Sequence, residues 1–177
     1  MTENRRFPFL PKFIATSFGA GYWPWGPGTA GAVVGLILWL PLALTGSFTT
    51  TILATLGLIV VFTFLGIWSA TVAEQFWGPD PSKVVMDETV GQWITMLPLS
   101  AFATVHAPLA SGSFWLWTVI SLILFRFFDI VKPLGVRKME DLPAGTGIMA
   151  DDILAGIYGA VVLAVAMYMF TDFPVWE

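Results

Sequence analysis

The chain has 177 residues, of which 56% are hydrophobic and only 11% are charged, and its mean hydropathy is +0.79. Because about a quarter of the residues in soluble domains are charged, we interpret this sequence as an integral membrane protein. The net charge of −4 gives no support to nucleic-acid binding, which requires a basic patch. The absence of cysteine excludes disulfides, thiol nucleophiles and zinc–thiolate sites.

Three long uncharged segments separate four short charged blocks; they run over residues 13–73, 89–125 and 153–171. A helix needs about 20 residues to cross a hydrocarbon core of about 30 Å. The first segment therefore has room for a leading loop and a helical hairpin. We expect its arms near Thr29 to Leu44 and Thr50 to Trp68, with the second arm extending as far as Glu74 and a turn at Thr45, Gly46 and Ser47.

The second segment predicts another hairpin, and the third predicts one more span. The break in the second falls around His106, Ala107, Pro108 and the Ser111-Gly112-Ser113 turn, and the last span covers Ile153 to Phe170. We interpret His106 as structural, because it is far in sequence from the other polar candidates. The expectation is an all-α integral membrane bundle of about five membrane-embedded helices, forming a single domain over residues 1–177.

The distribution of basic residues predicts the orientation. Two successive hairpins place the first three charged blocks on one side of the membrane, and those blocks hold all eight basic residues, Arg5, Arg6, Lys12, Lys83, Arg126, Lys132, Arg137 and Lys138. By the positive-inside rule, the N-terminus and both long polar loops are cytoplasmic, and the C-terminus with Asp172 and Glu177 is outside. We therefore expect a multi-pass protein of the cytoplasmic, or inner, membrane.

Five carboxylates are expected to converge at that face: Asp87 and Glu88 at the start of the third helix, Asp129 near the end of the fourth, and Asp151 and Asp152 at the start of the fifth. One interpretation is that acids near helix N-termini simply complement the helix dipole. The other interpretation is that the five carboxylates form a functional site. We favour a functional site because Glu88, Gln92 and Thr95 share one helical stripe, and a polar stripe within a membrane must face protein or water.

The stretch "FRFFDIVKP" places Arg126, Asp129 and Lys132 on one helical face before Pro133 ends the helix. Such spacing forms an ordinary i,i+3 ion pair. Alternatively, Asp129 holds a metal ion while Arg126 and Lys132 hold an anion, since arginine grips phosphate oxygens bidentately and lysine supplies a point charge.

Two glycine-rich stretches approach the same face. In "GPGTAGAVVG", Gly28 lies in a tight turn and Thr29 can cap the first helix, leaving N–H groups free for a phosphate. The alternative is a plain cap, with Gly31 and Gly35 allowing close helix contact. In "AGTGIMADD", residues 145–147 form either a flexible loop that closes over a ligand or a turn. With oxygen ligands only, a metal at this face would be Mg²⁺, Mn²⁺ or Ca²⁺.

Four motifs together resemble the phosphatidylglycerophosphatase A family: "PWGPGTAGA", "MDETVGQWITM", "FRFFDIVKP" and "GTGIMADDILAG". They occur in the family's order and spacing and span most of the chain from Gly21 to Gly159. The resemblance implies a membrane-embedded, Mg²⁺-dependent phosphatase that removes the terminal phosphate of phosphatidylglycerophosphate. The site residues that it implies are Asp87, Glu88, Asp129, Asp151 and Asp152 for metal binding and catalysis, and Gly28, Thr29, Arg126 and Lys132 on the phosphate side.

Residues and resemblance agree on one mechanistic hypothesis. Asp129, Asp151 and Asp152, with Asp87 or Glu88, bind one or two Mg²⁺, which polarise the phosphoryl group and acidify a bound water. Glu88 is the expected base, and Arg126 and Lys132 neutralise the phosphate. Other phosphatase designs are excluded, because the chain has one histidine, no cysteine and no D-x-D followed by threonine or valine.

Two other classes of function compete with a lipid phosphatase. The first is a small ion or metal transporter, in which carboxylates line a pathway; transporter sites usually lie near the membrane midplane, whereas these acids are all predicted at one face. The second is a non-enzymatic assembly subunit, which the Gly31 and Gly35 contact motif supports. The oligomeric state is not determined by the sequence.

Overall fold

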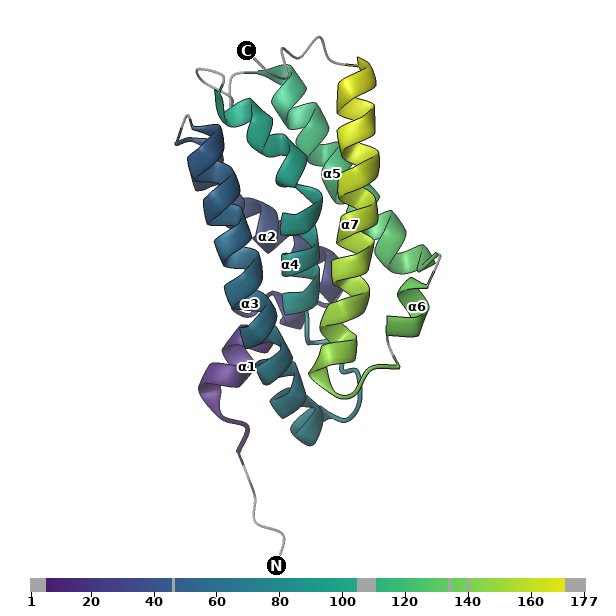
Figure 1. The fold of residues 1–177 in the computed structure, drawn as a ribbon. Coiled ribbons are helices and arrows are strands. Elements are labelled where there is room, and N and C mark those ends of the chain that lie inside the picture. Colours follow the sequence, from purple (N-terminus) through teal and green to yellow (C-terminus); the bar gives the residue numbers. More distant parts are fainter. Residues whose placement is uncertain (1–5, 46, 105–110, 134, 140, 171–177) are drawn as a thin grey trace, which may run out of the picture.

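The computed structural model describes residues 6–45, 47–104, 111–133, 135–139 and 141–170, and the regular structure in these residues is entirely helical (Figure 1). The predicted all-α class is confirmed for this part of the chain. Its elements are α1 (Phe9–Ala15), η1 (Ala20–Tyr22), α2 (Pro27–Ala43), α3 (Phe48–Trp77), α4 (Met86–Thr95), η2 (Leu97–Thr104), α5 (Gly112–Val131), α6 (Val136–Met139) and α7 (Gly145–Phe170).

Three of the described helices are long and apolar enough to cross a membrane, namely α3, α5 and α7. Helix α2 is apolar but has 17 residues, and α4 has ten. At 1.5 Å per residue α2 is roughly 25 Å long, short of a hydrocarbon core of about 30 Å. The count of five membrane-embedded helices and the cytoplasmic N-terminus therefore stay predictions.

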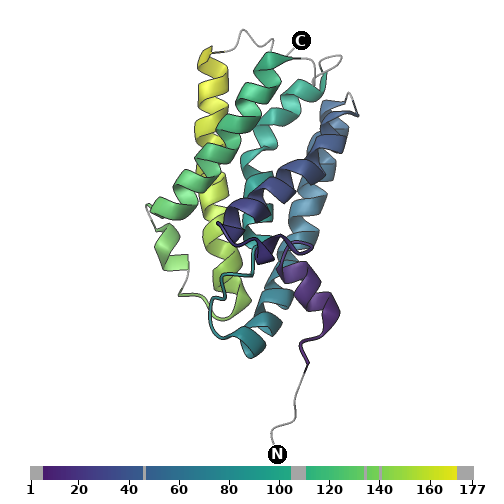
Figure 2. The ribbon, with the colours of Figure 1, turned by 180° about the vertical axis from the view of Figure 1, so that it is seen from behind.

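Helix α4 is the centre of the bundle. Every residue in it except Glu88 is buried, and α2, α3, α5 and α7 surround it (Figures 1 and 2). Glycines make this packing close: a Cβ on Gly156 of α7 would lie 2.6 Å from the carbonyl oxygen of Gly91, and one on Gly31 would lie 2.6 Å from that of Val85. A Cβ on Gly35 would similarly lie 2.9 Å from the Thr89 oxygen.

The packing of Gly31 and Gly35 bears on the assembly-subunit interpretation. Both glycines face α4 and its N-cap within the same chain, so the contact motif is used inside the bundle. It therefore gives no support to a contact with another protein.

The first predicted hairpin is confirmed as α2 and α3, and α3 extends beyond Glu74 to Trp77. The side chain of Ser47 caps α3 by accepting a hydrogen bond from the N–H of Thr50 at 3.3 Å. In the second hairpin, α4 ends at Thr95 and continues as η2, in which Pro98 cannot donate a backbone hydrogen bond. Gly46, His106, Ala107, Pro108, Asp172 and Glu177 lie outside the described residues.

The start of α7 differs from the prediction. Gly145, Thr146 and Gly147 form its first turn and are not a loop, so Asp151 and Asp152 lie about two turns inside the helix. Gly145 packs too closely against the backbone of α3 for a side chain to fit, and its N–H donates to Thr71 Oγ1 at 3.1 Å. The dipole explanation is therefore wrong for these two aspartates, because the dipole acts within the first turn.

The leading loop contains two elements that the sequence did not predict, α1 and η1. They dock beneath α4: the N–H of Val85 donates to the carbonyl of Ala15 at 2.8 Å, and the Ser17 hydroxyl donates to the carbonyl of Val85 at 2.9 Å. The short helix α6 between α5 and α7 was also missed. Residues 6–25 thus form part of the packed structure.

Gly156→Ala tests the close packing of α4 against α7. The new Cβ meets backbone, which cannot rotate away, so we expect a loss of roughly 1–3 kcal/mol of stability and a thermal midpoint in detergent that is several degrees lower. The matched control is Gly57→Ala on α3, where a Cβ meets nothing within 4 Å. Equal midpoints for both variants would contradict the packing argument.

Candidate functional site

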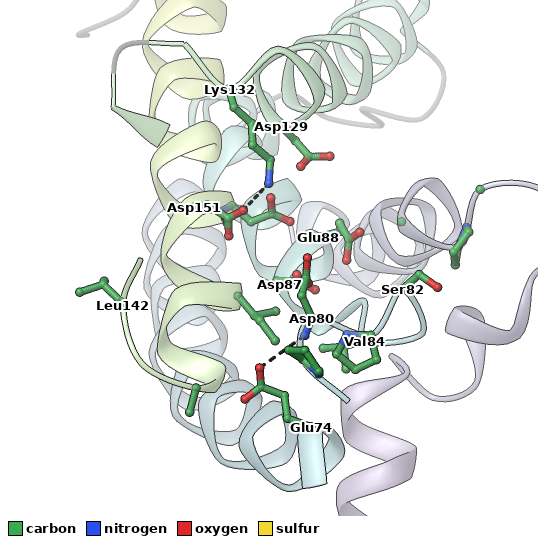
Figure 3. Close-up of a pocket in the computed structure, with 18 of the residues that line it drawn as sticks. Glu74, Asp80, Ser82, Val84, Asp87, Glu88, Asp129, Lys132, Leu142 and Asp151 are labelled. Atoms are coloured by element: carbon green, nitrogen blue, oxygen red, sulfur yellow. Dashed lines mark hydrogen bonds and ion pairs between the residues drawn. The ribbon is translucent and has the colours of Figure 1, made fainter. Parts of the chain in front are cut away.

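A cavity of about 590 Å³ lies at one end of the bundle, bounded by the first residues of α2, α4 and α7 and the last residues of α3 and α5 (Figure 3). The loop between α3 and α4 closes one side. Two basic residues line it, Arg126 and Lys132, together with seven acidic residues, Glu74, Asp80, Asp87, Glu88, Asp129, Asp151 and Asp152. The predicted convergence of five carboxylates is therefore observed, while their chemical roles stay predictions.

Three of these carboxylates form a compact group. One oxygen each of Asp87, Glu88 and Asp152 lies within 4.8 Å of the others, a spacing that allows a single metal ion to bind all three. Each residue also has a buried oxygen without a hydrogen-bond partner, namely Asp87 Oδ1, Glu88 Oε2 and Asp152 Oδ2. Buried carboxylate oxygens normally have partners, so this oxygen-only group fits a hard divalent cation such as Mg²⁺.

Helix α4 brings Asp87 and Glu88 to this group. Both lie in its first turn, where the N-cap residue Val85 makes no side-chain cap and the helix dipole favours negative charge. Asp152 comes from α7, which packs against α4 through glycines. The three-carboxylate group therefore depends on how closely α4 and α7 approach.

The other two predicted ligands are held in ion pairs. Arg126 Nη1 lies 2.6 Å from Asp129 Oδ2 and 3.8 Å from Glu88 Oε1, and Lys132 Nζ donates to Asp151 Oδ2 at 2.6 Å. The i,i+3 ion pair expected within "FRFFDIVKP" is thus present, and α5 ends just before Lys132 and Pro133 as predicted. The arrangement leaves Arg126 Nε buried without a hydrogen-bond partner.

The N-cap and first two residues of α2, Gly26, Pro27 and Gly28, line the cavity, but Thr29 does not. Gly28 lines the cavity, and a Cβ there would collide with the Glu88 carboxylate and lie 2.9 Å from Arg126 Nη1. Thr29 is exposed, and Gly26 is the N-cap residue, so the predicted cap by Thr29 is wrong. The physical reason is Pro27, because its fixed φ suits the first position of a helix. Helix α2 therefore starts at Pro27, two residues before the predicted start at Thr29.

The polar stripe below Glu88 faces protein, one of the two environments that the sequence allowed. Gln92 Nε2 donates to Ser121 Oγ at 3.1 Å, and the Thr95 hydroxyl lies 3.1 Å from the carbonyl of Gly91 and 3.2 Å from that of Gly156. These bonds tie α4 to α5 and α7. Neither Gln92 nor Thr95 lines the cavity, so the stripe serves packing below the site.

Sequence reasoning missed the acidic residues contributed by the segment "EQFWGPDPSK". Glu74 and Asp80 line the cavity, and Glu74 Oε1 accepts a 3.4 Å hydrogen bond from the N–H of Asp80. Asp80 has a φ of 44°, in a turn that follows Gly78 and is flanked by two prolines. An acidic residue within so tight a turn, seven residues before Asp87, was the available signal.

The sequence model of the family described as "Phosphatidylglycerophosphatase A" matches residues 13–167. A Bacteroides thetaiotaomicron protein named "Putative phosphatidylinositol-3-phosphatase" is 47% identical over 93% of this chain and 98% of its own. Proteins named "Phosphatidylglycerophosphatase A" are 32% identical in Haemophilus influenzae (95% and 98%) and 28% identical in Escherichia coli (85% and 79%). No solved structure matches.

Asp152→Asn tests whether the three-carboxylate group is electrostatically strained without a cation. At pH 8 in chelator, removing one charge relieves repulsion on the order of 1 kcal/mol, the energy of two unit charges about 4 Å apart even in water. We expect a thermal midpoint about 2–4 °C higher than that of the parent. Asp141→Asn is the matched control, because Asp141 is exposed and does not line the cavity. A lower midpoint for Asp152→Asn would contradict the prediction.

Proposed function

The chain belongs to the phosphatidylglycerophosphatase A family and is a phosphatase, and from this premise we propose that it converts phosphatidylglycerophosphate to phosphatidylglycerol and phosphate with the help of Mg²⁺. The observation that carries the proposal is the group formed by Asp87, Glu88 and Asp152. These three residues line a cavity that Arg126 and Lys132 also line, at one end of an apolar helical bundle, and each has a buried oxygen without a hydrogen-bond partner.

In the proposed mechanism Asp87, Glu88 and Asp152 hold the cation. A bound Mg²⁺ would offset the negative charge of the phosphoryl oxygens and lower the pKa of a coordinated water. Glu88 orients the attacking water and accepts its proton, since its carboxylate lies in the cavity and has an oxygen free of hydrogen bonds. A bond forms between phosphorus and the water oxygen, the bond to the glycerol oxygen breaks, and the glycerol oxygen takes up a proton.

Arg126 and Lys132 bind the phosphate in this proposal. Both are paired with carboxylates, Asp129 and Asp151, at 2.6 Å. Phosphate offers the same kind of acceptor with more charge, so it replaces these partners and frees Asp129 and Asp151 to join the ligand set. Arg126 and Lys132 then offset the negative charge that the phosphoryl oxygens carry during transfer.

The position of the cavity suits a lipid substrate. The apolar helices α3, α5 and α7 embed the bundle in the bilayer, while the cavity lies at their ends. A lipid headgroup can therefore reach the carboxylates while its acyl chains stay in the membrane. Basic residues gather at the same end, on α1, α5, α6 and the loop before α4, which supports a cytoplasmic-face site in the inner membrane.

A second candidate substrate is phosphatidylinositol 3-phosphate, favoured by the name of the 47% identical relative. Both lipids carry a monoester phosphate on a polyol. A cavity of about 590 Å³ lies within the usual range of roughly 300–1,000 Å³ for small-molecule sites. The same carboxylates, together with Arg126 and Lys132, would act on either headgroup.

Phosphate release in detergent micelles tests the proposal, with each lipid offered separately to the parent, Asp152→Asn and Asp141→Asn, in Mg²⁺ or chelator. We expect Mg²⁺-dependent release from phosphatidylglycerophosphate, unchanged in Asp141→Asn and reduced at least about a hundredfold in Asp152→Asn. Faster release from phosphatidylinositol 3-phosphate would reassign the substrate. No release from either lipid, together with Mg²⁺ flux into vesicles, would support a transporter instead.

Gly28→Ala tests the close approach of the α2 turn to Glu88 and Arg126. A methyl group there displaces both side chains, so we expect at least about a tenfold fall in kcat, since small misplacements of catalytic groups are costly. Gly112→Ala is the matched control, because a Cβ there meets nothing within 4 Å. If kcat is unchanged in Gly28→Ala, the close approach of Gly28 to Glu88 and Arg126 does not contribute to catalysis.

A further inference from the structure

Two lysines from distant parts of the chain converge on one aromatic ring outside the cavity. The Nζ atoms of Lys12, on α1, and of Lys83, in the loop before α4, lie 5.7 Å and 5.6 Å from the ring centre of Tyr22. Lys83 Nζ is also 5.5 Å from the ring of Trp77, at the end of α3. The two rings meet edge to face with centroids 6.4 Å apart, so four separate segments build this basic aromatic cluster.

The two ammonium groups of the cluster have no acidic partner among the residues that the structure describes. In the part of the chain that the structure describes, the ion pairs involve Arg126 and Lys132, and neither Lys12 nor Lys83 takes part in one. Lys83 is exposed and Lys12 is partly exposed. This contrasts with the cavity, where Arg126 and Lys132 are both paired with carboxylates, so the cluster offers two positive charges that no described carboxylate neutralises.

Helix lengths place the cluster at the membrane surface. Helix α3 has 30 residues and is roughly 45 Å long, against a hydrocarbon core of about 30 Å. Its last turn, which carries Trp77, therefore reaches the headgroup region. Large aromatic side chains close in sequence to Lys12 and Tyr22 are exposed: Phe9 is 76% exposed, Trp23 55% and Trp25 82%. Exposed aromatic residues beside lysines are typical of the membrane–water interface.

The cluster is separate from the cavity but attached to its wall. Its four residues do not line the cavity, whereas Ser82 and Val84 on either side of Lys83 do. The backbone of Lys83 packs so closely against Gly21 that a Cβ on the glycine would collide with the Lys83 carbonyl. In the loop before α4, Asp80, Ser82 and Val84 thus line the cavity, while the Lys83 side chain contacts Tyr22.

We propose that Lys12 and Lys83 bind the phosphate of an anionic phospholipid at this surface, at a site distinct from the cavity. Each lysine supplies a point charge with three N–H donors. Cation–π contacts hold the Lys12 ammonium at Tyr22, and the Lys83 ammonium at Tyr22 and Trp77. The exposed aromatic side chains enter the interface beside the bound lipid. A lipid is the occupant because unpaired cations and exposed apolar rings lie together at headgroup depth.

Lipid binding tests the proposal without relying on catalysis. The parent protein in neutral detergent is titrated with phosphatidylglycerol or phosphatidylcholine, and native mass spectrometry measures the affinity of each bound lipid. In Lys12→Gln/Lys83→Gln we expect one phosphatidylglycerol site to weaken about tenfold to thirtyfold, since each basic residue near an anionic lipid surface contributes on the order of one kcal/mol. Phosphatidylcholine binding should change little.

Three controls make the result decisive. Arg137→Gln/Lys138→Gln removes two exposed basic residues from α6 and should leave the affinity unchanged. Lys12→Arg/Lys83→Arg keeps both positive charges and should retain binding. This variant distinguishes weaker binding caused by lost charge from weaker binding caused by misfolding. Asp152→Asn should bind phosphatidylglycerol at this site as the parent does. Parent-like affinity in the glutamine variant, equal losses in the α6 control, or an equal loss of phosphatidylcholine binding would overturn the proposal.

Discussion

Repulsion among the carboxylates of Asp87, Glu88 and Asp152 is the interaction that the surrounding structure must offset. Three acidic groups with oxygens within 4.8 Å of one another are unfavourable wherever water is scarce. The bundle holds them together through the packing of α4 between α2 and α7, and places Arg126 near Glu88 at 3.8 Å. The close packing thus preserves a group of carboxylates that a divalent cation would neutralise.

Glycine is what permits this arrangement. Gly91 and Gly156 bring α4 and α7 together, and Gly28 lets the first turn of α2 approach Glu88 and Arg126. In lipid the hydrophobic effect gives little drive for helices to associate, so close backbone contact contributes much of the packing energy. The same glycines that stabilise the bundle therefore also set the dimensions of the site.

At the end of the bundle that holds the cavity, some basic side chains form ion pairs and others do not. Inside the cavity, Arg126 and Lys132 are paired with Asp129 and Asp151, so an incoming phosphate must compete with carboxylates. Outside the cavity, Lys12 and Lys83 lie near aromatic rings, and neither forms an ion pair with a residue that the structure describes. The loop before α4 joins the two regions, because Ser82 and Val84 line the cavity while Lys83 between them contacts Tyr22.

The sequence by itself determined the helical class, the first hairpin and the five acids that meet at the cavity, because uncharged length and helical spacing are local properties of a chain. It did not determine that α7 begins at Gly145, because that start depends on packing against α3. Nor did it determine that Thr29 lies away from the cavity while Glu74 and Asp80 line it. Which carboxylates cluster and which form ion pairs was decided by tertiary structure alone, since it depends on distances between side chains far apart in sequence.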